Sequence, residues 1–109
     1  MEWLRPTQFL AVAGPAGWRV LSDGAYAAFP TASIRESARL VGDIAGLPSV
    51  AGAARPPAID VRAGAVTVRL ISEDEGQYGL TVDDANRAVA ITAVAEGLGQ
   101  LDYASLGTL

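Results

Sequence analysis

The sequence contains no cysteine and no histidine. Without cysteine, the chain has no disulfide, no thiolate nucleophile and no cysteine-ligated metal site. Without histidine, it lacks the commonest metal ligand and the side chain that titrates most readily near neutral pH. The two absences exclude the familiar cysteine and histidine arrangements of nucleophilic and metal catalysis, so acid–base chemistry in this chain must come from other groups.

Lysine is also missing, so all 8 basic residues are arginines, and 12 acidic residues give a net charge of −4. A weakly acidic chain without a basic stripe suits nucleic acid poorly, and we expect no nucleic-acid partner. No apolar run approaches the roughly 20 residues of a membrane helix, and the first residues, MEWLRP, lack the features of a signal peptide. We therefore expect a cytoplasmic protein without membrane contact.

The length of 109 residues and the 50% share of hydrophobic residues predict a single domain over residues 1–109 with a modest core. Turn signals and hydrophobic periodicity divide the chain into its elements. These are a helix over 8–13, strands over 17–21 and 25–29, a helix over 34–45, strands over 59–62 and 65–71, a polar loop over 72–78, and a helix from 82 to the glycines at 97 and 99. The tail 100–109 has no clear period and is expected to be irregular, or held by Tyr103 and Leu106.

Local signals predict the helix ends and the buried faces. Thr7 is the expected N-cap of the first helix, while Ser33 with Glu36 and Thr81 with Asp84 form capping boxes at the starts of the other two. The predicted inward stripes consist of Ile34, Ala38, Val41, Ile44 and Ala45 in the central helix, of Val66, Val68 and Leu70 in the strand over 65–71, and of Ala88, Ile91, Ala95 and Leu98 in the last helix.

The element order α-β-β-α-β-β-α has a natural two-layer solution. Four antiparallel strands form one sheet, and the helices pack on one of its faces. We therefore predict an α+β fold of this kind. The small residues Ala85, Thr92 and Ala93 on the last helix would let another helix approach closely, which favours self-association.

Two stretches carry a family resemblance. One is PAIDVRAGAVTVRLISEDEGQYGLTVDDANRAVAI, in which GLT is followed three residues later by Asp84, and the other is the preceding GWRVLSDGAYAAFPTASIRESARLVGDIAGLP. Together they resemble the pterin-4a-carbinolamine dehydratase family in order and spacing over residues 7–98. The resemblance implies the same two-layer fold and assembly into homodimers or homotetramers.

Members of this family dehydrate a 4a-hydroxytetrahydropterin to the quinonoid dihydropterin, so the resemblance implies a small-molecule, pterin-like ligand. The reaction needs one proton delivered to the leaving hydroxyl and another removed from a ring nitrogen. The family uses histidines for both, in a His-His-Pro motif before the third strand and at a further position after the fourth. Here the motif falls on Arg55, Pro56 and Pro57, and the further histidine falls on Glu73, which Asp74 follows.

The charged residues at these positions form the candidate site. Glu73 and Asp74 are the candidate catalytic groups, and Arg55 is a candidate anion clamp. Further ligand contacts are expected from Pro57, Trp18, Tyr78 and Asp84. We expect no cofactor and no metal, because the acidic run Glu73, Asp74 and Glu75 lacks a recognised metal-binding spacing.

Each candidate also has a purely structural alternative. In that alternative Asp84 is a helix cap, Trp18 is a core or interface residue, and Glu73 belongs to a solvated acidic loop. Arg55 would then face water. Tyr78, on the polar loop, is either a lid over the site or a contact for a partner.

Two functions from different classes stay open. The first is a diverged dehydratase-like enzyme, a lyase, which binds and transforms a small molecule in the family pocket but has lost pterin dehydration itself. The second is a non-catalytic, oligomeric binding or assembly protein on the same scaffold. The clustered charged replacements favour the first function, whereas the loss of every histidine favours the second.

Overall fold

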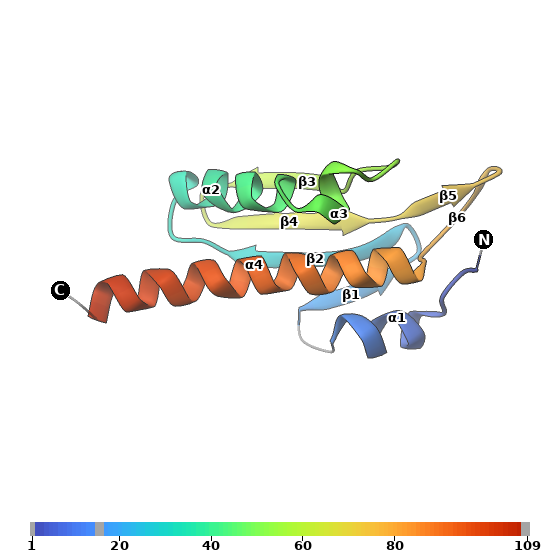
Figure 1. Cartoon of the computed structure of the whole chain (residues 1–109), viewed down its shortest axis with the longest axis horizontal. Helices are drawn as coiled ribbons and strands as arrows, with labels where there is room; N and C mark the ends of the chain where they lie inside the picture. Colours follow the sequence, from blue (N-terminus) through green and yellow to red (C-terminus); the bar gives the residue numbers. More distant parts are fainter. Residues whose placement is uncertain (1, 15–16, 108–109) are drawn as a thin grey trace.

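The computed structural model describes residues 2–14 and 17–107, with side-chain surroundings described as far as residue 97. The elements, in chain order, are α1 (Pro6–Ala13), β1 (Trp18–Leu21), β2 (Gly24–Pro30), α2 (Ile34–Ala45), α3 (Pro48–Ala51), β3 (Ala58–Arg62), β4 (Ala65–Leu70), β5 (Ser72–Asp74), β6 (Gln77–Gly79) and α4 (Val82–Gly107). Figure 1 shows α2 and α4 lying in front of the sheet. Within the described part of the chain, no helix is both long enough and apolar enough to span a bilayer.

The sheet joins two hairpins in the order β1-β2-β4-β3, and every pairing is antiparallel. The central strands β2 and β4 place Ala27 opposite Val68 and Phe29 opposite Val66. Helix α2 packs on β3 and β4, and α4 packs against α1 and α2. The predicted α+β fold is therefore confirmed, with α3 and the two-stranded ribbon β5–β6 added to the expected elements.

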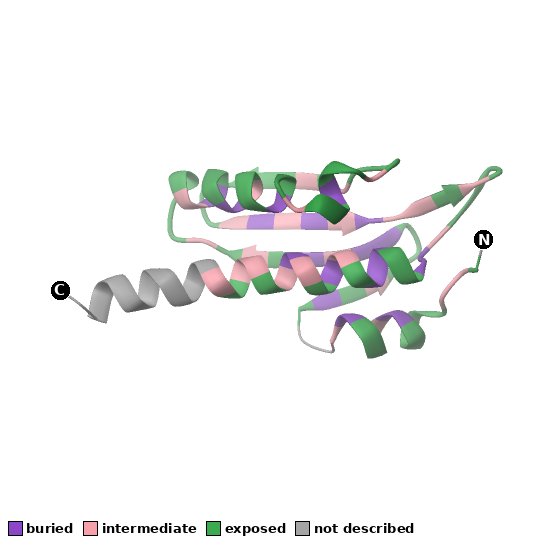
Figure 2. Cartoon of the chain, in the orientation of Figure 1, coloured by how far each residue is buried: buried purple, intermediate pink, exposed green. Residues whose placement is uncertain are grey.

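Residues of β4 alternate between the core and the opposite face, as the sequence predicts. Val66, Val68 and Leu70 are buried, whereas Thr67 and Arg69 between them are half-buried (Figure 2). This alternation is the period of two that places successive strand side chains on opposite faces. The sheet face away from the helices is therefore the face that carries Arg69.

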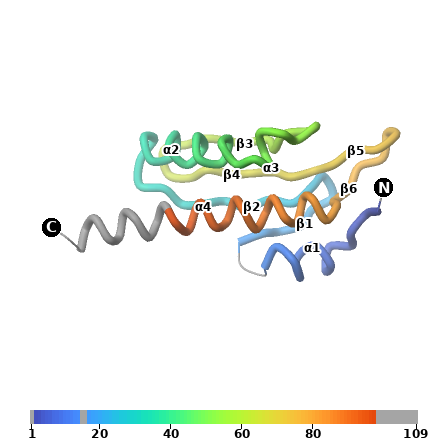
Figure 3. Tube along the Cα trace, viewed as in Figure 1, coloured from blue at the N-terminus to red at the C-terminus, as the bar shows by residue number. Residues whose placement is uncertain are grey.

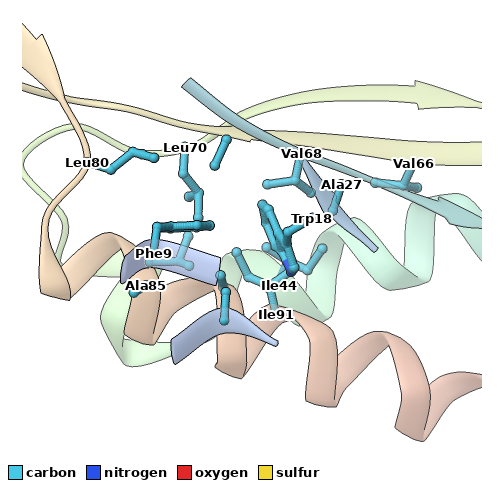
Figure 4. Close-up of a cluster of buried hydrophobic side chains, with 14 of the residues drawn as sticks. Phe9, Trp18, Ala27, Ile44, Val66, Val68, Leu70, Leu80, Ala85 and Ile91 are labelled. Carbon is cyan, nitrogen blue, oxygen red and sulfur yellow. The ribbon is translucent and has the colours of Figure 1, made fainter. Parts of the chain in front are cut away.

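Trp18 lies within the core, beside Phe9 (Figure 4), and meets two other aromatic rings edge-on. Its ring centroid is 6.2 Å from those of Phe9 and Phe29, in T-shaped arrangements. The indole Nε1–H donates a hydrogen bond to Thr92 Oγ1 at 2.8 Å. This bond ties β1 to α4 and satisfies the one polar atom of the indole.

The start of α1 differs from the expected cap at Thr7. The helix begins at Pro6, and Arg5 is its N-cap residue in extended conformation. The backbone N–H of Arg5 donates to Gln8 Oε1 at 2.8 Å. Proline is favoured at the first helical position because its φ is already helical and its missing N–H would have no partner there.

The buried face of α2 also differs from the predicted stripe. Ser33 is the N-cap as expected and accepts from the Glu36 N–H at 3.1 Å, but Ile34 is 58% exposed. The residues that face inward are Ser37, Leu40 and Ile44, and exposed positions also include Ala38 and Ala45. Ile44 of the predicted stripe is buried and Val41 packs against the core, as expected. Hydrophobicity alone missed Ser37 because it is polar, yet its hydroxyl donates to the Arg62 carbonyl at 2.6 Å.

Residues 72–79, expected as a polar loop, form the ribbon β5–β6. Its turn places Glu75 at φ 51° and Gly76 at φ 80°, and the chain then passes directly into α4 (Figure 3). The N-terminal segment runs against the base of this ribbon, where the Leu4 N–H donates to the Leu80 carbonyl at 2.7 Å. Trp3 covers Gly79 so closely that a Cβ there would lie 2.6 Å from its ring.

Helix α4 continues past the glycines at 97 and 99 and reaches Gly107, so the expected helix end and irregular tail are wrong. Glycine lowers helix stability by only about 1 kcal/mol, and it does not by itself end a helix. Ala88 and Ile91 of the predicted stripe are buried. The expected roles of Leu98, Tyr103 and Leu106 concern side chains outside the described ones.

Candidate functional site

A cavity of about 600 Å³ opens at the end of the molecule where the ribbon, the N-terminal segment and the start of α4 come together (Figure 1). The loop that follows α3 supplies the remaining wall. The polar residues that line it are Glu2, Arg55, Ser72, Glu73, Thr81, Asp83 and Arg87. This volume lies in the range of small-molecule sites.

Arg55 and Glu73 meet at the cavity wall. Their side chains form an ion pair in which Nη2 lies 3.0 Å from Oε2, and they are 42% and 39% exposed. The Arg55 guanidinium also lies over the ring of Tyr78, with its carbon 5.2 Å from the ring centroid. An ion pair this exposed adds little stability, about 0–1 kcal/mol, so both groups are available to a ligand.

Asp84 lies directly behind the cavity and is 2% exposed. Its Oδ2 accepts from the Thr81 N–H at 2.9 Å, from the Thr81 hydroxyl at 3.1 Å and from the Ser72 hydroxyl at 2.8 Å. The Asp84 N–H donates back to Thr81 Oγ1 at 3.3 Å, so the predicted capping box is confirmed. The carboxylate sits at the positive end of α4 and fixes Ser72, which is a cavity residue.

Arg87 closes the cavity from the helix side. Its Nη1 donates to Asp84 Oδ1 at 3.2 Å, and its Nε donates to the carbonyl of Ser49 at 2.7 Å. Because Ser49 belongs to α3, this side chain joins α3 to α4. Arg87 follows Asp84 by one helical turn, which is the sequence signal that would have found it.

The structure brings together some of the candidate residues and separates others. Arg55 and Glu73 line the cavity, and Asp84 supports it from behind. Tyr78 instead contacts Arg55 from the far side and lines a smaller hollow. The candidates that line neither space are Pro57, Trp18, Asp74 and Asp84.

Trp18 is 3% exposed and belongs to the core, which is the structural alternative to a ligand contact. Glu2, Ser72 and Asp83 are cavity residues for which the sequence offered no signal. In the part of the chain that the structure describes, no three acidic side chains are grouped so that they could hold a metal ion. The cavity therefore offers carboxylates as acceptors and guanidinium groups as donors.

No protein-family model and no curated protein sequence matches this chain. Among solved structures, the crystal structure of a transcriptional coactivator/pterin dehydratase from Brucella melitensis is similar, with a TM-score of 0.70. The alignment covers 86% of this chain and 99% of that chain at 16% sequence identity. The chain thus has a fold of the pterin dehydratase class. At this identity, the similarity shows the fold alone.

Proposed function

We propose that this chain is a diverged relative of the pterin-4a-carbinolamine dehydratases and binds a small polar molecule in the cavity beside Asp84. The observation that carries the proposal is the pairing of Arg55 with Glu73, which are 18 positions apart in sequence. The resemblance aligns both with histidine positions of the family, and both line one cavity. Charged replacements that converge in this way support a retained binding site rather than two unrelated surface changes.

The polar lining indicates the kind of ligand. Arg55 and Arg87 offer N–H donors, while the carboxylates of Glu2, Glu73 and Asp83 offer acceptors. A planar heterocycle with donors and acceptors along its edge, as in a pterin, can pair with both sets. A purely anionic or purely apolar molecule would leave one set without partners, which is costly in a partly enclosed site.

Within this proposal, Glu73 is the proton acceptor and Arg55 polarises or holds the ligand. An ionised carboxylate accepts a proton, whereas a guanidinium only donates hydrogen bonds. The cavity has no imidazole, because the sequence contains no histidine. We infer that the family dehydration is slow or lost, and that a lyase-type step begins with proton removal by Glu73. Asp74 does not line the cavity, so the proposal uses Glu73 alone.

The test measures binding and turnover separately. Calorimetric titration with a tetrahydropterin should give saturable binding that becomes about tenfold weaker in Arg55→Gln, because a charge-assisted hydrogen bond is lost. Any dehydration of the 4a-carbinolamine should fall about 100-fold in Glu73→Gln, as expected for loss of a general base.

Arg62→Gln is the matched control for this experiment. Arg62 also forms an exposed ion pair, with Nε 2.9 Å from Asp60 Oδ2, but it does not line the cavity. Its substitution should leave both measurements unchanged. The proposal fails if the protein neither binds nor turns over these pterins, or if Arg55→Gln and Arg62→Gln behave alike.

Self-association into a homodimer or homotetramer, which the resemblance implies, belongs to the same proposal. The small size of the chain supports it, because a chain of 109 residues gains core by assembling. Light scattering behind size exclusion measures the mass directly. A monomeric mass over a wide range of protein concentration would contradict self-association, and it would not affect the proposal that the cavity binds a small molecule.

A further inference from the structure

A second hollow of about 290 Å³ lies on the other side of Arg55. We call it the recess, and its lining residues are Ser22, Asp23, Arg55, Arg69, Ile71 and Tyr78. Its walls are the turn between β1 and β2, the end of β4 and the ribbon. Two of the lining side chains are guanidinium cations, and one is a carboxylate.

Arg69 reaches the recess across a glycine. A Cβ built at Gly24 would lie 3.2 Å from Cγ of Arg69 and 2.5 Å from the Leu70 carbonyl oxygen. Gly24 also has a φ of 136°, a conformation that other residues avoid. The missing side chain at this turn therefore makes room for the stem of Arg69 to pass over the strand.

The guanidinium of Arg69 makes no hydrogen bond within the described part of the chain. Its Nε is buried and has no partner. Its Nη1 lies 3.6 Å from Asp23 Oδ2, which is an ion pair but too long for a hydrogen bond. That carboxylate oxygen accepts instead from the Tyr26 hydroxyl at 2.7 Å. A buried donor without a partner is uncommon and needs an explanation.

Arg55 supplies the second cation of the recess. Its guanidinium lies over the Tyr78 ring, and among the described residues its hydrogen bond is the one that Nη2 donates to Glu73. Two guanidinium groups that line one hollow repel each other unless an anion lies between them. The planar fork of N–H donors on each group matches the oxygens of carboxylate and phosphate.

We propose that the recess is an anion subsite that takes a carboxylate or phosphate group, with Arg69 as the main donor and Arg55 as the second. Nε of Arg69 lies below the surface, so the guanidinium turns outward to meet the anion. This rotation of the side chain gives the unpartnered N–H a charge-assisted hydrogen bond to the anion. The anion subsite needs no ligand in the larger cavity, although Arg55 lines both spaces.

The probe is inorganic phosphate, titrated into the isotope-labelled protein, with acetate in a parallel arm to separate phosphate from carboxylate preference. Saturable shifts are expected for the backbone amides of Ser22, Asp23 and Ile71. In Arg69→Gln the dissociation constant for phosphate should rise about tenfold. The dissociation constant of Arg69→Lys should lie between those of the parent and Arg69→Gln, because lysine keeps the charge but loses the planar pair of N–H donors. The amide spectrum of each variant reports whether it is folded.

Asp23→Asn tests whether the negative charge of Asp23 weakens phosphate binding in the recess. The substitution removes the one acidic side chain from the lining, so phosphate should bind several-fold more tightly at low salt. Arg62→Gln is the control, because Arg62 is a 78% exposed arginine outside the recess, and its variant should bind as the parent does. The proposal is overturned if no saturable shifts occur, if Arg69→Gln binds unchanged, if Arg62→Gln weakens binding equally, or if Asp23→Asn binds more weakly.

Discussion

At the scale of single residues, Asp84 carries the start of α4. One carboxylate oxygen accepts from Thr81 and Ser72, and the other accepts from Arg87. The carboxylate is buried, at 2% exposure, yet both of its oxygens accept hydrogen bonds. A buried charge is tolerated when all its partners are present. Removal of one partner destabilises the fold, because the remaining buried polar groups then lack a hydrogen bond.

Asp84→Asn should therefore lower the free energy of unfolding by about 2–4 kcal/mol. The amide keeps one acceptor but turns its NH₂ group toward donors, and Arg87 loses its counter-charge. Urea unfolding measures the change. Asp83→Asn is the matched control in the same helical turn, because Asp83 is exposed, and it should cost less than about 1 kcal/mol. Equal losses in the two variants would contradict this account of the cap.

At the scale of elements, the ribbon β5–β6 is held by the N-terminal segment. Trp3 lies on Gly79, and the backbone of Leu4 bonds to Leu80. The ribbon in turn carries Ser72 and Glu73 into the cavity. A contact between segments far apart in the sequence thus positions the candidate site.

Gly79→Ala should disturb this contact, because the new Cβ would lie 2.6 Å from the Trp3 ring. We expect a loss of about 1–3 kcal/mol in the free energy of unfolding, measured by chemical denaturation. The same substitution in a Trp3→Ala background should cost less, since the clash is gone, and the difference is a coupling energy. Gly64→Ala, where a Cβ would meet nothing within 4 Å, should be close to neutral. Additive effects of Trp3→Ala and Gly79→Ala would refute the packing explanation.

Elements with local signals could be predicted from the sequence, and those that depend on distant partners could not. The N-cap at Ser33, the capping box of Thr81 and the alternation along β4 are local patterns, and the structure contains them. The predicted capping box at Ser33 is only half formed, because the Glu36 carboxylate accepts from the Ala32 N–H at 2.7 Å and not from the Ser33 N–H. The inward position of Ser37 depends on a carbonyl 25 residues away, at Arg62. The ribbon was missed because its strands are short and polar, and they lack the hydrophobic alternation that marks a strand.

The candidate site was predictable to a similar extent. The resemblance pointed to Arg55 and Glu73, and these two line one cavity. Glu2 was missed, because its place in the wall depends on how the N-terminal segment packs, whereas Arg87 could have been found from its position one helical turn after Asp84. Spacing within a motif shows which residues are near in sequence, but it does not show which distant segment completes a wall.

At the scale of the whole molecule, Arg55 is shared by the cavity and the recess. Glu73 and an anion in the recess should therefore compete for one guanidinium. Glu73→Gln is expected to tighten phosphate binding two- to five-fold, in keeping with the value of about 0–1 kcal/mol for an exposed ion pair. The phosphate titration described above measures it.

Asp60→Asn is the control for this coupling, because it removes the carboxylate partner of another exposed arginine, Arg62, outside both spaces. Its phosphate affinity should equal that of the parent protein. Weaker phosphate binding in Glu73→Gln would show that Glu73 and the anion do not compete for Arg55.

The placement of Glu2 and Leu4 in the cavity wall has a practical consequence for handling the protein. A purification tag attached ahead of Glu2 would begin close to the cavity wall and would bring its own charges and histidines near Arg55. Affinities recorded on such material would report the tag as well as the protein. The far tip of α4 points away from that mouth (Figure 1), so a tag appended there would leave the opening clear.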